Sequence, residues 1–94
     1  MNGEAINRQS RPYLPRHVRL HFDPVREKYA VLAPEKVFWP DEVAVYILQL
    51  LDGKRDLNAI AGELSKVFDA PHEMIAADTL SFLQLWHELR LVRI

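Results

Sequence analysis

The spacing of the apolar residues changes at Trp39–Pro40, and this change constrains the fold more than any other feature. Before it, apolar residues alternate with polar ones in short runs, which is the pattern of half-buried β-strands. After it, they recur every three or four residues, which is the pattern of amphipathic helices. We therefore expect an α+β fold in which three strands precede three helices.

The first half predicts three short strands. In the run 18–22 the apolar residues fall on one face, and turn-forming residues at 23–27 join it to the run 28–32 as a hairpin. Pro34 then breaks the second strand. The run 36–39 is β-branched and aromatic, which predicts a third strand. The three runs together predict a three-stranded antiparallel sheet.

The second half predicts three helices with clear ends. Helix one begins near Pro40 or Asp41, because proline is tolerated at the first helical position, and Asp52–Gly53 ends it. Asp56 is a good N-cap for helix two. Pro71 opens helix three, which runs to about residue 89. Three amphipathic helices can cover one face of the sheet, so we expect a winged-helix-like arrangement.

The chain length of 94 residues fits one domain. Residues 1–16 contain two prolines and few apolar side chains, so we expect a flexible basic arm, whose end Tyr13 and Leu14 could pin to the domain. Residues 17–94 form the domain, and the extended tail 91–94 could add to its sheet. The segment 1–22 has one acid, Glu4, and a net charge of +3 from four arginines: Arg8, Arg11, Arg16 and Arg19.

The residues offer no catalytic or metal-binding pattern. The chain has no cysteine, which excludes disulfides, zinc–cysteine sites and protein-ligated iron–sulfur clusters. His17 and His21 lie about 13 Å apart along a strand, and His72 and His87 about 22 Å apart along a helix, too far for one metal ion. No serine lies in a nucleophile-elbow motif, and no glycine-rich phosphate loop is present. We therefore predict a protein that is not an enzyme and needs no cofactor.

Charge argues against nucleic acid and membranes as partners. The 12 basic and 13 acidic residues nearly balance, and no apolar run approaches a membrane span, so we expect a soluble cytoplasmic protein. A recognition helix normally carries Lys or Arg for the phosphates. Residues 71–89 carry neither, and they contain three acids, Glu73, Asp78 and Glu88. A DNA-binding winged helix therefore stays only as an alternative.

Protein binding is the function that the sequence pattern still favours. A three-stranded sheet has open edges, which proteins usually block unless they use them. An extended peptide can add a strand to such an edge. The run 36–39 and one flank of helix three could form the two walls of this site, with Leu80 as the best candidate for exposure. An open edge could also pair with a second copy, so a homodimer by strand or arm exchange is possible.

Several segments of the chain resemble those of a known protein family. Three segments carry the resemblance in order and spacing: Leu32-Ala33-Pro34-Glu35, then Leu51-Asp52-Gly53-Lys54-Arg55, then Ile60-Ala61-Gly62-Glu63-Leu64. Arg11-Pro12, Val18-Arg19-Leu20, Ile47-Leu48 and the spacing of Asp78 to Phe82-Leu83 agree with it. The chain resembles PqqD, the small protein of pyrroloquinoline quinone (PQQ) biosynthesis, over roughly residues 11–94.

The resemblance implies a peptide chaperone. It would bind the precursor peptide PqqA and present it to the radical-SAM enzyme PqqE, which cross-links a glutamate and a tyrosine in that peptide. The family resemblance places the peptide as an extra strand beside strand three and against helix three. The implied contacts are Lys36, Val37, Phe38, Leu80, Leu83, Gln84 and His87.

The chain departs from the family pattern at two places. Where many members have a polar residue and a small pair near the start of helix one, this chain has residues 39–44, Trp-Pro-Asp-Glu-Val-Ala. Where many have glycine after helix three, it has Arg90-Leu91. Two further alternatives remain beside DNA binding: non-catalytic binding of the finished quinone, and a small enzyme acting on a late quinone intermediate.

Overall fold

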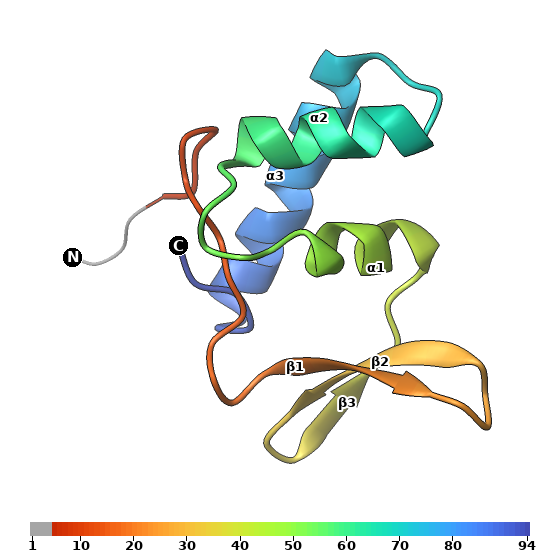
Figure 1. The fold of residues 1–94 in the computed structure, drawn as a ribbon. Coiled ribbons are helices and arrows are strands. Elements are labelled where there is room, and N and C mark those ends of the chain that lie inside the picture. The colour runs from red at the N-terminus through yellow and green to blue at the C-terminus, as the bar shows by residue number, and fades with distance from the viewer. Residues whose placement is uncertain (1–4) are drawn as a thin grey trace.

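The computed structural model describes residues 5–94, and it confirms the predicted sheet followed by three helices (Figure 1). The third strand ends one residue before the predicted Trp39. The second and third helices match their predicted bounds to within about one residue, whereas the first helix ends at Gln49, three residues before the predicted Asp52. The elements are strands β1 (Arg19–Asp23), β2 (Lys28–Ala33) and β3 (Lys36–Phe38), and helices α1 (Glu42–Gln49), α2 (Leu57–Val67) and α3 (His72–Glu88).

The sheet is antiparallel, in the order β1-β2-β3. Its register places Leu20 opposite Val31, and Val31 opposite Phe38. Residues that are directly opposite share one face of a sheet. Val31 is completely buried, and Leu20 and Phe38 pack on the same core, so this face is the one that meets the helices. The central strand β2 leaves β1 and β3 as the two edges.

Helices α1 and α2 begin close to their predicted starts, and Asp56 is the N-cap predicted for α2. The Asp41 carboxylate accepts a hydrogen bond of 2.9 Å from the backbone N–H of Ala44, and Asp56 does the same for Ala59, also at 2.9 Å. Each bond satisfies an amide that the first helical turn leaves free. Helix α3 starts after Pro71 without a side-chain cap.

The core lies between the sheet and the α2–α3 pair, with α1 in the middle (Figure 1). It consists of residues from every helix and from β2, together with residues from outside these elements. Its completely buried large members include Val31, Leu57, Ile60 and Leu83. Within residues 5–94, no helix is both long and apolar enough to cross a membrane.

Residues 5–16 differ from the expected flexible arm, because they pack along the domain. Ile6 is buried in the core, and the Arg8 guanidinium forms an ion pair of 2.9 Å with Glu73 on α3. The backbone N–H of Leu57 donates to the carbonyl of Ser10. Residues 1–4 of the predicted arm lie outside the described residues. We call residues 5–16 the N-terminal strap.

The C-terminal tail does not extend the sheet as expected. Instead, Arg93 and Tyr13 exchange two backbone hydrogen bonds of 2.8 Å, so the tail lies beside the strap (Figure 1). Tyr13 also bridges to Asp52, next to Gly53, whose φ of +75° suits glycine. The expected anchoring role of Tyr13 is thereby confirmed, and the strap and the tail stabilise each other.

Candidate functional site

Strand β3 is an edge strand whose outer side pairs with no other strand in residues 5–94. An edge of this kind presents unpaired backbone N–H and C=O groups. Lys36 and Val37 are exposed, with 54% of the Val37 surface accessible, and Phe38 is half-buried. These three sequence-predicted residues therefore form one open edge.

A row of aromatic rings joins this edge to α3. The centre of the Phe38 ring lies 6.0 Å from that of Trp86, and Trp86 stacks on Phe82 at 5.0 Å. Strand alternation turns Phe38 toward the helices, and a spacing of four residues brings Phe82 and Trp86 to one side of α3. Such aromatic pairs contribute about 0.5–1.5 kcal/mol beyond the area they bury.

The aromatic row belongs to a longer apolar stripe. Phe82, Leu85, Trp86 and Leu89 follow the i, i+3, i+4, i+7 spacing of one helix face, with Leu89 at the C-cap. Leu85 and Leu89 are 53% and 52% exposed, although both are large and apolar. We call these four residues the α3 stripe. Trp86 of this stripe contacts Phe38 of β3, whereas Leu85 also borders the hollow beside Ile6 of the strap, so the exposed part of the stripe lies between the two flanks of α3.

The four residues predicted on α3 lie elsewhere. Leu80 and Gln84 line a hollow beside Ile6 of the strap, and the backbone N–H of Ile6 donates to Gln84 Oε1 at 3.3 Å. His87 Nδ1 lies 3.0 Å from the carbonyl oxygen of Val92 in the tail. Leu83 is completely buried in the core. The structure therefore brings together Lys36, Val37 and Phe38, but it does not bring the four α3 residues to them.

The contacts predicted from the sequence did not include Phe82, Leu85, Trp86 or Leu89. The sequence signal for this face was its helical spacing. Positions 82, 85, 86 and 89 fit one helix face as well as positions 80, 83, 84 and 87 do. Only the position of the strap decides between the two flanks. The strap covers the flank of Leu80 and Gln84, and Phe82 and Trp86 of the α3 stripe form the aromatic row with Phe38 of β3.

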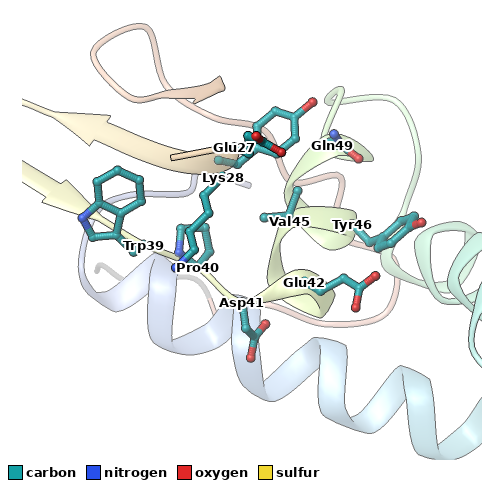
Figure 2. Close-up of a pocket in the computed structure, with 10 residues that line it drawn as sticks. Glu27, Lys28, Trp39, Pro40, Asp41, Glu42, Val45, Tyr46 and Gln49 are labelled. Carbon is teal, nitrogen blue, oxygen red and sulfur yellow. The ribbon is translucent and has the colours of Figure 1, made fainter. Parts of the chain in front are cut away.

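Two pockets lie on either side of the segment that links β3 to α1. The first, of about 600 Å³, lies between the hairpin and α1, and we call it the hairpin pocket (Figure 2). Trp39, Tyr46 and Lys28 contribute to its walls, and the Arg26 guanidinium carbon lies 5.3 Å from the centre of the Trp39 ring. Trp39, which begins the segment that departs from the family pattern, therefore lies outside the core.

The second pocket, of about 450 Å³, lies between α1 and α3, and we call it the α1–α3 pocket. Its walls are mostly apolar, and Asp41 and Asp78 are the charged residues among them. Phe82 and Trp86 of the α3 stripe line it as well, so it is continuous with the aromatic row beside β3. The lining residues are Pro40, Asp41, Val43, Ala44, Ile47, Leu64, Phe68, Ala70, Ile75, Asp78, Thr79, Phe82 and Trp86.

The perturbed carboxylates lie away from this site. A hydrogen bond from the Arg8 side chain holds the pKa of Glu73 below its usual range, and Arg26 lowers the pKa of Asp23 in the same way. A backbone hydrogen bond from Arg55 lowers the pKa of Asp52. These carboxylates stabilise turns and the strap. Residues 5–94 contain no group of three or more acidic or histidine side chains placed to hold a metal ion.

Comparison with known proteins agrees with this architecture. The family model of PqqD, described as coenzyme PQQ synthesis protein D, matches residues 28–92. A PqqA binding protein of Rhodopseudomonas palustris (strain HaA2) is 46% identical over 80 residues, covering 85% of this chain and 78% of the relative. One of Rhizobium meliloti (strain 1021) is 47% identical over 83 residues, covering 88% and 85%.

Two solved structures share the fold. One is the solution NMR structure of the PqqD truncation of Methylobacterium extorquens PqqCD, a stand-alone recognition element for ribosomally synthesised and post-translationally modified peptides. It has a TM-score of 0.81 and 40% identity, covering 96% of both chains. The other is the crystal structure of PqqD from Xanthomonas campestris, with a TM-score of 0.59 and 37% identity over 95% of this chain and 99% of that one. The chain therefore belongs to the PqqD family.

Proposed function

We propose that this chain binds the precursor peptide PqqA as an added strand on the open edge of β3. The observation that carries the proposal is the row of rings from Phe38 to Trp86 and Phe82, which sets an apolar wall beside unpaired backbone groups. An added strand gains affinity from main-chain hydrogen bonds and specificity from side-chain contacts. The relatives named PqqA binding protein support PqqA as the occupant.

The proposed contacts are Lys36, Val37 and Phe38 on one wall and the α3 stripe on the other. They replace the α3 residues expected from the sequence, because Leu83 is completely buried and Gln84 is bonded to the strap. The exposed surface of Leu85 and Leu89 would be covered by the peptide, which gives these large apolar residues a reason to face solvent in the free protein.

The proposed role is that of a non-catalytic adaptor, which presents PqqA to the radical-SAM enzyme PqqE. The absence of cysteine means that the iron–sulfur chemistry of such an enzyme cannot be supplied by this chain. Because ribosomes make the precursor peptide, we also propose the cytoplasm as the place of binding. A PqqE cross-linking assay with and without this chain tests presentation, and equal yields in both would contradict it.

Peptide binding is tested by NMR titration of the labelled chain with PqqA. We expect amide shifts along residues 36–38 and at the α3 stripe, and little change along β1. Shifts confined to β1 or to the strap would contradict the proposal.

Light scattering over a concentration series, with and without PqqA, tests whether two copies pair at the same edge. If they pair through β3, the peptide should dissociate the dimer.

A further inference from the structure

The α1–α3 pocket begins where strand β3 ends. Phe38 is the last residue of β3, and Pro40 and Asp41, which follow within three residues, already line the pocket. Trp86 contacts Phe38 and also lines the pocket, so one aromatic surface runs from the strand edge into it. No residue of β3 itself lines the pocket. A peptide must therefore continue past the strand to reach it.

The pocket is apolar and large enough for a big side chain. Its volume of about 450 Å³ is within the usual range for small-molecule binding pockets, roughly 300–1,000 Å³. Val43, Ile47 and Ile75 present aliphatic groups, and Phe82 and Trp86 present rings. Water in such a pocket finds few hydrogen-bond partners, so an aliphatic or aromatic side chain that displaces it gains free energy.

The rim of the pocket carries a negative charge that is available to a ligand. Asp78 is exposed, and it forms no ion pair within the part of the chain that the structure describes. Asp41 also lies at the rim, but its carboxylate already accepts the capping hydrogen bond from Ala44. A cationic group beside the apolar side chain would therefore meet Asp78. Helix α3 carries neither Lys nor Arg that could compete.

We propose that the α1–α3 pocket is a second contact site for the bound peptide, and that it selects a large apolar residue next to a Lys or Arg. This inference rests on the proposed function. The part of the peptide that continues past Phe38 must be extended. At about 3.3 Å per residue, the pocket would take the peptide side chain two or three positions beyond the peptide residue that pairs with Phe38. Affinity then depends on residues of the peptide that make no strand hydrogen bonds to β3.

Filling the pocket is the first test. Ala70→Phe places a ring in the pocket from the loop before α3, and Ala77→Phe makes the same change at an exposed position of α3 that does not line the pocket. We expect Ala70→Phe to weaken PqqA binding about tenfold, the loss from failing to bury one large side chain, and Ala77→Phe to leave it unchanged. Equal affinity of Ala70→Phe and the wild type would overturn the proposal.

An alanine scan of PqqA against wild type and Ala70→Phe identifies the anchor. One apolar position should lose about tenfold with the wild type and almost nothing with Ala70→Phe, because the pocket is already filled. Likewise, neutralising one neighbouring basic residue should weaken binding to the wild type and not to Asp78→Asn. Glu88→Gln, which removes one charge about 15 Å away on α3, is the matched control. If the loss of affinity from the peptide change simply adds to the loss from Ala70→Phe, and likewise for Asp78→Asn, the pocket does not bind these peptide residues.

A measurement on the wild-type chain keeps the test valid if Ala70→Phe fails to fold. Intermolecular NOEs should connect a PqqA side chain to methyl groups of Val43, Ile47 and Ile75, which all line the pocket. If PqqA binds and shifts residues 36–38 without these NOEs, the pocket inference is wrong and the proposed function stands. If PqqA does not bind the wild type at all, the proposed function itself fails.

Discussion

Leu85→Ala tests the α3 stripe without disturbing the core. Leu85 is 53% exposed, so about half of its side chain is available for burial by a bound peptide. Complete burial of a leucine contributes about 1.5–3 kcal/mol, and half of that is about 1 kcal/mol. Since 1.4 kcal/mol is a factor of ten in affinity, Leu85→Ala should raise the Kd for PqqA about fivefold.

The assay is isothermal titration calorimetry with PqqA, together with urea unfolding of each variant. Unfolding should change little, because alanine is a good helix former and the position is exposed. Val67→Ala is the matched control, since Val67 is also 53% exposed but lies at the end of α2, outside the α3 stripe. Equal Kd values for wild type and Leu85→Ala, or equal losses in both variants, would refute the reasoning.

Three further predictions concern stability. Leu83→Ala should cost about 2–5 kcal/mol in urea unfolding, because Leu83 is completely buried, while the folded fraction should bind PqqA with unchanged Kd. Asp56→Ala should cost about 1 kcal/mol through loss of the α2 cap, and a similar loss in Asp56→Asn would argue against capping. Arg8 lowers the pKa of Glu73, so ionised Glu73 contributes to folding stability above about pH 4.3. This contribution is lost as the pH falls through the lower pKa that Glu73 has in the folded state. Urea unfolding at pH 7 and pH 3 should therefore differ less in Glu73→Gln than in wild type.

The element order could be predicted because each local signal agreed with the fold. The alternating apolar residues, the helix start near Pro40 or Asp41 and the cap at Asp56 all depend on interactions within a few residues, and the structure contains them. Strand alternation also accounts for the direction of Phe38, which the structure turns toward the helices, although the family resemblance implied it only as a peptide contact.

The path of the strap could not be predicted from the sequence, and the strap lies beside Leu80 and Gln84, two of the expected contacts. A helix pattern shows which residues share a face, but not which neighbour covers that face. Ile6 was a single apolar residue in a polar segment, and its burial beside Gln84 depends on contacts across 78 positions of sequence. The strap therefore covers the flank on which Leu80 and Gln84 were expected to bind the peptide, and the aromatic part of the α3 stripe, Phe82 and Trp86, remains next to Phe38 of β3.

Intermolecular NOEs between the labelled chain and unlabelled PqqA test the central proposal most directly. Strand addition predicts short contacts between peptide backbone protons and residues Lys36–Phe38, together with contacts from peptide side chains to Leu85 and Trp86. A bound peptide whose contacts lie along β1, or beside Leu80 and Gln84, with none at β3, would contradict strand addition at this edge.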